Sequence, residues 1–208
     1  MIVIIDYKMG NIGSIKNMLK KIGTEAVITS KPNEIRDAHK LILPGVGSFD
    51  TGMNHIRKMD ILPTLHEKVM LHKTPILGIC LGIQLFTEKS EEGTQTGLGW
   101  IKGETVRFRI NHQETGLKIP HMGWNSISVK KKESLLKNCQ KDIRFYFVHS
   151  YHVVCKNEAD ILATTHHGYD FVCAIQRNNI LGVQFHPEKS HQYGMQVLRN
   201  FVEMETQC

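Results

Sequence analysis

The first eighty residues contain four short apolar runs separated by longer amphipathic stretches, and this alternation limits the possible folds more than any other feature. The runs cover residues 2–5, 26–28, 41–43 and 75–79. Because each run is so short, it is typical of a buried strand rather than of a helix. Strands that alternate with helices predict an α/β fold with a mostly parallel, doubly wound central sheet.

Helices are expected between these runs and near the far end of the chain. Asn11 fits an N-cap, apolar residues recur at helical spacing after it, and Gly23 ends the helix. Further helices are predicted over about 61–72, from Leu81 onward, and over about 194–204.

The second half of the chain is richer in strand-forming residues. Runs such as 145–148 and 171–175 are punctuated by glycines between about 100 and 185. They predict an added antiparallel β region. Because we find no linker, low-complexity segment or internal repeat, we expect residues 1–208 to form a single domain.

Composition excludes several classes of protein. The chain has 41% hydrophobic and 22% charged residues and a net charge of +6, as in ordinary globular proteins. Its one tight basic run, 130–132, has no interleaved aromatic residues, so we expect no nucleic-acid binding. No apolar run approaches the roughly 18 residues of a membrane span. The five cysteines, at 80, 139, 155, 173 and 208, form no C-x-x-C pair and indicate reduced thiols in the cytoplasm.

The most informative motif is Gly78-Ile79-Cys80-Leu81-Gly82, at the end of the fourth apolar run. A sharp strand-to-helix turn of this kind projects a nucleophile out of the sheet, and the flanking glycines leave room for the turn. The N-terminus of the helix that follows would favour a negatively charged sulfur. Taken alone, the motif fits a buried structural cysteine equally well.

A second motif, Gln184-Phe185-His186-Pro187-Glu188, places an imidazole and a carboxylate two residues apart. Alternate residues of an extended segment face the same side, and Pro187 biases His186 toward that conformation. Glu188 could therefore orient the imidazole, as in the base half of a catalytic triad. A surface His–Glu pair after a strand is the alternative.

A third motif, Pro44-Gly45-Val46-Gly47, follows the third apolar run. The carboxyl ends of neighbouring parallel strands line one crevice, so this turn should lie beside Cys80. Backbone N–H groups of Val46 and Gly47, together with that of Leu81, would then form an oxyanion hole. The three motifs together favour a cysteine nucleophile over a structural cysteine.

These motifs resemble those of the class I, or triad, glutamine amidotransferases, and the resemblance extends over essentially the whole chain. It implies the fold of that family and the hydrolysis of L-glutamine to glutamate and ammonia, with Cys80 as nucleophile, His186 as proton shuttle and Glu188 as its orienting group. It implies neither a cofactor nor a metal. The residues implied to bind glutamine are Gly47, Gln84, Ser150 and Tyr151.

Within that class, the chain is most similar to the glutaminase subunits of imidazole glycerol phosphate synthase, through residues 9–11 and 119–125. That similarity implies a heterodimer with the synthase (cyclase) subunit of histidine biosynthesis, with Asn11, Trp124 and Lys189 at the interface. Paralogous glutaminases that supply a sugar amidotransferase of surface-polysaccharide biosynthesis share these features. Trp124, taken alone, also fits a core aromatic residue.

Other classes of protein fit the sequence less well. A cysteine peptidase would need a cleft for a polypeptide, and an α/β-hydrolase carries its acid before the histidine. A catalytically silent binding module conflicts with an intact triad. We expect no metal site at His149 and His152 or at His166 and His167, because neither spacing puts two rings on one face of a strand.

Overall fold

The computed structural model describes residues 1–131, 135–139 and 142–204, so Lys132 and Cys208 lie outside the described residues. Its helices are α1 (Ile12–Lys21), α2 (Pro32–Arg36), α3 (Phe49–Lys58), α4 (Leu62–His66), α5 (Leu81–Leu85), α6 (His112–Thr115) and α7 (His191–Glu203), with shorter turns η1 (Glu67–Leu71), η2 (Glu158–Asp160) and η3 (Pro187–Lys189). The strands are β1 (Ile2–Ile5), β2 (Ala26–Thr29), β3 (Lys40–Gly45), β4 (Ile76–Cys80), β5 (Lys89–Ser90), β6 (Gly103–Arg107), β7 (His121–Ser126), β8 (Ser128–Val129), β9 (Arg144–His149), β10 (Tyr151–Cys155), β11 (Ile161–His167), β12 (Tyr169–Arg177) and β13 (Ile180–Val183).

A large mixed sheet runs through the molecule in the order β2-β1-β3-β4-β13-β12-β10-β6-β5. The strands from β2 to β13 are parallel, whereas β13, β12, β10 and β6 pair antiparallel. β11 and β8 extend the sheet from β12, and β7 and β9 form a separate antiparallel pair. The predicted parallel, doubly wound sheet with antiparallel additions is confirmed.

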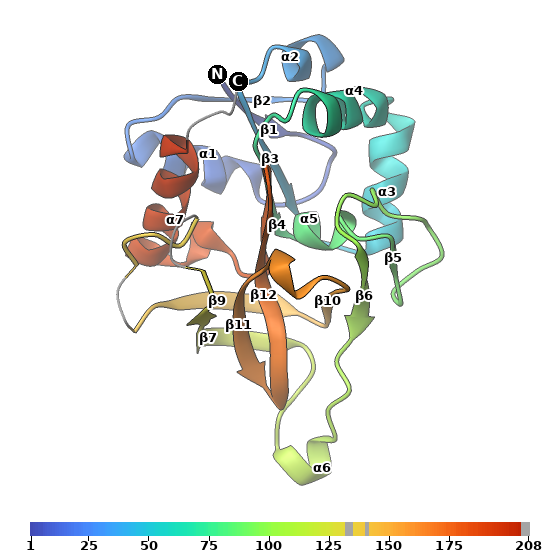
Figure 1. Ribbon diagram of the computed structural model, residues 1–208, viewed down its shortest axis with the longest axis vertical. Coiled ribbons are helices and arrows are strands. Elements are labelled where there is room, and N and C mark those ends of the chain that lie inside the picture. Colours follow the sequence, from blue (N-terminus) through green and yellow to red (C-terminus); the bar gives the residue numbers. More distant parts are fainter. Residues whose placement is uncertain (132–134, 140–141, 205–208) are drawn as a thin grey trace.

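Helices cover both faces of the parallel strands (Figure 1). On β1, Ile2 and Ile4 share a core with α1 and α7, whereas Val3 and Ile5 share a core with α3, α4 and α5. Both faces of the strand are therefore buried, which explains why its sequence is a continuous apolar run rather than an alternating one.

Several boundaries differ from those predicted. β3 continues through Pro44 and Gly45, where we expected a turn. Proline has no N–H group to donate to a neighbouring strand. Pro44 is tolerated because β1 pairs with β3 only as far as Ile42, so no carbonyl of β1 is left without a donor. The helices α2 and α3 were not predicted, and the expected helix over 61–72 consists of α4 followed by the π-helical turn η1.

The C-terminal helix is anchored by a buried lysine. Lys40, at the amino end of β3, is 8% exposed, and its Nζ donates to the carbonyl oxygens of Val202 and Met204. Helix ends leave carbonyl groups without intrahelical partners, and this amine satisfies two such groups. Helix α7 therefore starts next to the His186 segment and ends at the amino end of the parallel strands (Figure 1).

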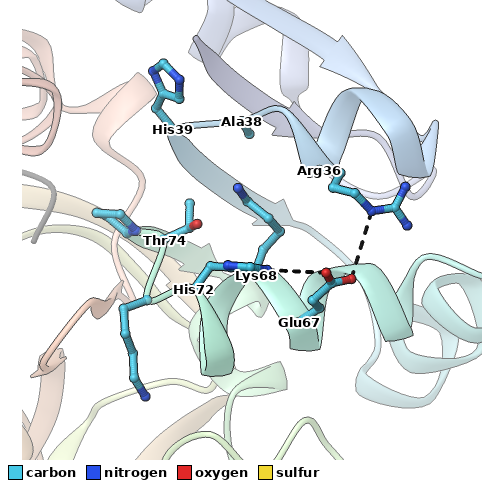
Figure 2. Close-up of a pocket in the computed structure, with 9 residues that line it drawn as sticks. Arg36, Ala38, His39, Glu67, Lys68, His72 and Thr74 are labelled. Carbon is cyan, nitrogen blue, oxygen red and sulfur yellow. Dashed lines mark hydrogen bonds and ion pairs between the residues drawn. The ribbon is translucent and has the colours of Figure 1, made fainter. Parts of the chain in front are cut away.

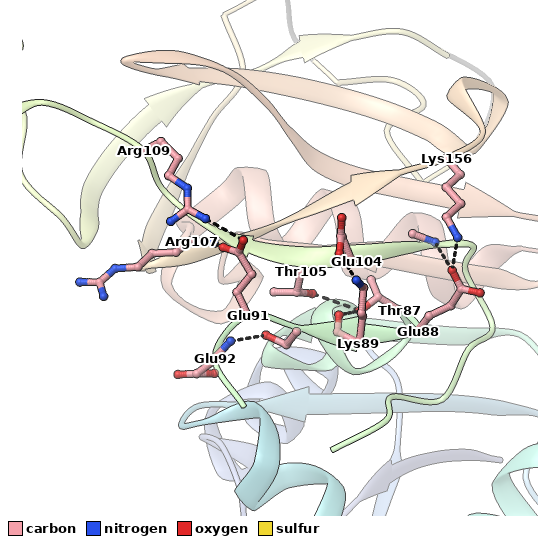
Figure 3. A network of polar contacts seen from close by, with 12 residues as sticks. Thr87, Glu88, Lys89, Glu91, Glu92, Glu104, Thr105, Arg107, Arg109 and Lys156 are labelled. Atoms are coloured by element: carbon pink, nitrogen blue, oxygen red, sulfur yellow. Dashed lines mark hydrogen bonds and ion pairs between the residues drawn. The ribbon is translucent and has the colours of Figure 1, made fainter. Parts of the chain in front are cut away.

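A network of charged side chains fixes the edge of the sheet at β5 and β6 (Figure 3). Glu88 accepts from Lys156 Nζ at 2.8 Å and Lys102 Nζ at 3.2 Å, and these hydrogen bonds lower the pKa of Glu88 to about 2. The neighbouring Glu92 accepts at 2.8 Å from the backbone N–H of Phe49, the first residue of α3. The loop after β5 thereby holds the start of the helix that follows the 44–47 turn.

Close packing under the Cys80 turn makes one substitution sharply unfavourable. A Cβ on Gly82 would lie 1.9 Å from the carbonyl oxygen of Leu43, so Gly82→Ala should destabilise the protein by about 2 kcal/mol or more. Gly13 in α1 is a matched control, because nothing lies within 4 Å of a Cβ there and alanine favours a helix by roughly 1 kcal/mol. Urea unfolding of both variants checks this. Equal stabilities of the two variants would contradict it.

Candidate active site

Cys80 occupies a strained turn between β4 and α5. Its backbone has φ 53° and ψ −106°, a conformation that side-chain-bearing residues rarely adopt. A Cβ on Gly78 would lie 2.6 Å from the ring of Phe86 and 2.8 Å from the backbone of Gly82. Glycine is therefore required at both flanking positions, as the motif indicates, because the strand and the helix meet without room for side chains.

One expectation for Cys80 was wrong. The residue is only 6% exposed rather than projecting into solvent, because neighbouring groups pack against its sulfur. The Sγ–H group points to the carbonyl oxygen of Val148 at 4.0 Å, and the side-chain amide of Gln184 donates to Sγ at 3.7 Å. Helix α5 begins at Leu81, directly after Cys80, as expected.

The 44–47 turn lies beside Cys80, as expected from the sheet. The register pairs Gly45 with Cys80, so the turn and α5 begin side by side. Gly47 has φ +131°, and a Cβ there would lie 2.5 Å from Met9 Cε. Val46, in contrast, is 51% exposed. The glycine carries the positive φ, which leaves the Val46 side chain at the surface.

Tyr7 lies under the same turn and was not among the predicted site residues. Its side chain is fully buried, and its hydroxyl has no hydrogen-bond partner in the described part of the chain. A Cβ on Gly45 would lie 2.4 Å from that hydroxyl. Burial, and then the nearby Cys80 sulfur, raise the pKa of the Tyr7 phenol well above its usual range. The phenol therefore stays neutral beneath the turn.

His186 and Glu188 form a buried hydrogen-bonded pair. Nδ1–H of His186 donates to Oε1 of Glu188 at 2.7 Å, and both side chains are 2% exposed. The residues from Pro187 form a 3₁₀ turn rather than the extended segment we expected. The hydrogen bond between the two side chains still forms because His186 itself is extended, with φ −102° and ψ 98°. The backbone N–H of His186 donates to the Tyr146 carbonyl at 2.9 Å.

The surroundings of His186 favour its protonated form. Burial lowers the pKa of His186, but the neighbouring Cys80 sulfur and the Glu188 carboxylate outweigh this effect and raise the pKa to about 9. Nε2 is buried and, within the described residues, meets no partner at good hydrogen-bond geometry. Because Nδ1 is engaged by Glu188, Nε2 is the nitrogen free to exchange a proton near Cys80.

This pair makes stability depend on pH. The folded state binds the His186 proton more tightly than the unfolded state, so this proton stabilises the fold. The stabilisation is fully present below about pH 6.5 and is lost as pH rises through about 9. We expect the free energy of unfolding to fall by up to about 3 kcal/mol across that window. Urea titrations at intervals across it test this. Parallel curves for Glu188→Gln and the unaltered protein would contradict it.

The residues implied to bind glutamine lie around the junction between β9 and β10. Gln84, in α5, is 5% exposed, and its Nε2 donates to the carbonyl oxygen of Tyr151 at 3.0 Å and to Oε1 of Gln184 at 3.1 Å. Ser150, between β9 and β10, and Tyr151, at the start of β10, are half-buried. The structure thus connects Tyr151 and Gln84 to Cys80 through the side chain of Gln184.

A group of histidines beneath this junction was not predicted. The carbonyl oxygen of Tyr151 can only accept, so the Nδ1 atom of His149, 2.7 Å away, carries a proton. His149 Nε2 therefore accepts from His121 Nδ1 at 3.1 Å. Nε2 of His121 in turn accepts from Asn125 at 3.2 Å, and Asn125 also donates to the carbonyl of His166. Two backbone carbonyls thus fix the tautomers of both rings.

The same histidines pack around one aromatic ring. The centroid of the Phe108 ring lies 5.3 Å from that of His149 and 4.8 Å from that of His152. We had expected these two histidines not to share one face of a strand. The chain turns at Ser150 between β9 and β10, which brings them together. Burial lowers the pKa of His121 to about 4 and holds that of His149 well below its usual value, so both rings are neutral. Among the described residues, no group of three or more ligands is arranged to hold a metal ion.

The three residues implied at an interface are all exposed. Asn11 caps α1, accepting from the backbone N–H of Ser14 at 3.4 Å. Trp124 is 43% exposed and stacks on His191 at 5.5 Å, so it is not a core aromatic residue. Lys189 lies 5.5 Å above the ring of Tyr146, the residue paired with Trp124.

Other features lie away from the triad residues. A cavity of about 470 Å³ lined by Arg36, His39, Lys68 and Thr74 lies at the amino ends of β3 and β4 (Figure 2), whereas Cys80 lies at a carboxyl end. Burial raises the pKa values of three further thiols, to about 11 for Cys139, to about 12 for Cys155 and well above the usual range for Cys173, so they stay protonated. In the described part of the chain, no helix is long and apolar enough to cross a membrane.

Comparison with known proteins places the chain in a family. The family described as Glutamine amidotransferase class-I matches residues 3–204. The protein named Imidazole glycerol phosphate synthase subunit HisH 2 of Methanococcus maripaludis is 52% identical, over 98% of this chain and 99% of its own. The protein of the same name from Pseudomonas aeruginosa is 48% identical, over 98% and 100%.

Solved structures agree on the fold. A glutamine amidotransferase crystal structure superposes with a TM-score of 0.72 at 20% identity, covering 97% of each chain. The structure of PurLQS from Thermotoga maritima superposes with a TM-score of 0.73 at 17% identity, covering 97% of this chain and 96% of that one. With the family match and the close relatives, these findings show that the chain belongs to the class I glutamine amidotransferase family.

Proposed function

We propose that this chain is a glutaminase subunit that uses Cys80, His186 and Glu188 to hydrolyse L-glutamine and passes the ammonia to the cyclase partner of an imidazole glycerol phosphate synthase. The observation that carries the catalytic part is the buried His186–Glu188 pair, 2.7 Å apart, beside a cysteine held at positive φ. The relatives that carry the name of that synthase subunit support the choice of acceptor.

The chemistry follows from which atoms are free. Cys80 Sγ gives its proton to His186 Nε2 and attacks the side-chain carbonyl carbon of glutamine, and N–H groups of Val46, Gly47 and Leu81 stabilise the oxyanion. His186 Nε2 gives its proton to the departing nitrogen, so ammonia leaves and a glutamyl thioester forms. Water then loses a proton to Nε2 and attacks the thioester, which releases glutamate and restores the thiol. Glu188 holds Nδ1–H throughout.

The partner surface is proposed at the edge where the triad lies. Val46, Met122 and Trp124 are exposed large apolar side chains, at 51%, 62% and 43%. Met122 and Trp124 lie two positions apart on β7 and so share one face of the strand. Lys189 lies beside this face, because its amine sits over the ring of Tyr146. Apolar and aromatic residues with a basic rim are typical of a protein interface. Asn11 would contribute from the start of α1.

A second enzyme that could receive the ammonia is worth testing, because the relatives carry different numerals in their names. The proteins from Methanococcus maripaludis and Pseudomonas aeruginosa both carry the numeral 2 in their names, whereas two from Campylobacter jejuni carry the numeral 1. This chain is 52% and 48% identical to the two proteins numbered 2 and 43% identical to the two numbered 1. The alternative is a sugar amidotransferase of surface-polysaccharide biosynthesis.

Glutamate release from glutamine, with and without an added cyclase subunit and its nucleotide substrate, tests the proposal. We expect stimulation on the order of 10²-fold, because the partner would order the exposed Val46–Gly47 peptide and complete one oxyanion donor. Trp124→Ala should weaken the partner's affinity about tenfold or more. Leu71→Ala is the matched control, since Leu71 is 71% exposed in η1, outside the proposed surface.

The outcomes separate the parts of the proposal. Hydrolysis that the cyclase does not stimulate would overturn the histidine-pathway acceptor and favour the sugar amidotransferase. Equal losses of affinity in both variants would overturn the surface around Trp124. No glutamate release in any arm would overturn the glutaminase itself.

A further inference from the structure

The side chain of Gln184 reaches the Cys80 sulfur from beneath the site. Gln184 is fully buried, and its backbone N–H donates to the carbonyl of Cys173 at 2.9 Å, which fixes the start of the segment leading to His186. Its Nε2 lies 3.7 Å from Cys80 Sγ, a normal distance for a hydrogen bond to sulfur. Its Oε1 accepts from Gln84 at 3.1 Å.

The direction of this hydrogen bond is set by a backbone carbonyl. The Tyr151 carbonyl oxygen can only accept, so the amide group of Gln84 that faces it at 3.0 Å must be the NH₂ group. The same NH₂ group faces Gln184 and therefore requires an oxygen there. The only group that Gln184 can then turn toward Cys80 is its own NH₂. Flipping either amide would place two donors or two acceptors against each other.

We propose that Gln184 is a positioning residue that donates an N–H to the Cys80 sulfur and stabilises it as an anion, with its orientation locked by Gln84 and the Tyr151 carbonyl. The inference rests on the proposed role of Cys80 as nucleophile. In the thiol form, Sγ–H points to the Val148 carbonyl, and that contact is lost on ionisation. The Gln184 donor remains and becomes a charge-assisted hydrogen bond, which is stronger than a neutral one.

Alkylation of Cys80 by iodoacetamide as a function of pH tests the proposal without glutamine or a partner. Gln184→Met keeps the length of the side chain and removes the donor, so the midpoint of the pH–rate profile should move up by about one pH unit. Gln184→Glu keeps the shape but replaces the donor with an acceptor, and should move the midpoint further. Gln84→Met removes the lock while leaving Gln184 in place, so a smaller upward shift is expected.

Gln176→Met is the matched control, because Gln176 lies on β12 of the same sheet and its buried Oε1 has no partner among the described residues. Its profile should coincide with that of the unaltered protein. Mass spectrometry assigns the modification to Cys80, and thermal unfolding establishes that each variant is folded. If the Met variant does not fold, Gln184→Leu takes its place, because it also removes the donor without adding a charge.

The outcomes distinguish this inference from the proposed function. Unshifted profiles in both Gln184 variants would overturn the donor role, whatever the activity with glutamine. A shifted profile in a protein that never releases glutamate would support the donor role and overturn the glutaminase. A shift for Gln184→Met but none for Gln84→Met would overturn the lock through the Tyr151 carbonyl.

Discussion

Cys80→Ser should lower glutamine hydrolysis by about 10⁴-fold or more, the scale seen when a triad nucleophile is removed. A hydroxyl has almost the same shape as the thiol but is far less acidic, so the strained turn and its packing remain while the nucleophile is lost. With the partner enzyme present, synthesis from added ammonium should continue, because ammonia then bypasses this site. Glutamate release and ammonium-dependent product formation, measured on one preparation, provide both readouts.

A second thiol provides the control for that experiment. Cys139 is half-buried, and burial raises its pKa to about 11, so Cys139→Ser should leave glutamine hydrolysis within about twofold of the unaltered protein. Glutamine hydrolysis that persists in Cys80→Ser would remove Cys80 as the nucleophile. Loss of ammonium-dependent synthesis in the same variant would instead indicate a damaged complex.

Glu188→Gln should lower kcat by about 10³- to 10⁴-fold with little change in KM. The carboxylate accepts from Nδ1–H of His186 at 2.7 Å, whereas a glutamine could turn its NH₂ group to the same nitrogen. The imidazole could then carry a proton only on Nε2, so it could no longer hold both its own proton and the one that the thiol gives up. The substitution is nearly isosteric at a side chain that is 2% exposed, so the fold should persist.

Steady-state kinetics with thermal unfolding on the same samples tests this expectation. Glu203→Gln is a suitable control, because Glu203 is half-exposed at the end of α7 and pairs with Lys137 at 3.8 Å. A kcat within tenfold of the unaltered enzyme would show that Glu188 does not orient the base. A raised KM with unchanged kcat would point to a role in binding instead.

The parallel strands and the motifs at their ends could be predicted because their signals are local. A continuous apolar run means a strand buried on both faces, and a glycine-flanked cysteine after such a run means a tight turn. Helix α3 was missed although it carries a local signal: Ser48 caps it by accepting from Thr51 at 3.4 Å, and Phe49, Met53 and Ile56 recur at helical spacing.

The remainder of the site depends on contacts that the sequence does not encode locally. Gln184 stands in a quoted motif, but its contact with Cys80 spans 104 positions and depends on the pairing of β13 with β4. In the sequence, Tyr7 is an ordinary residue after the first strand. Only the structure shows that Gly45 packs against its hydroxyl. His149 and His152 meet only because the chain turns at Ser150.

The anchoring of α7 by Lys40 has a practical consequence for protein engineering. The helix leaves the active-site edge at His191 and is tied down at Met204 near the amino end of β3, which is about 20 Å away along its 13 residues. A fluorescent reporter or affinity handle appended after this helix would emerge on the side away from the active-site edge and leave the proposed partner surface uncovered. A linker that tethers an acceptor enzyme to the end of this helix would have to span the same distance back to the active-site edge.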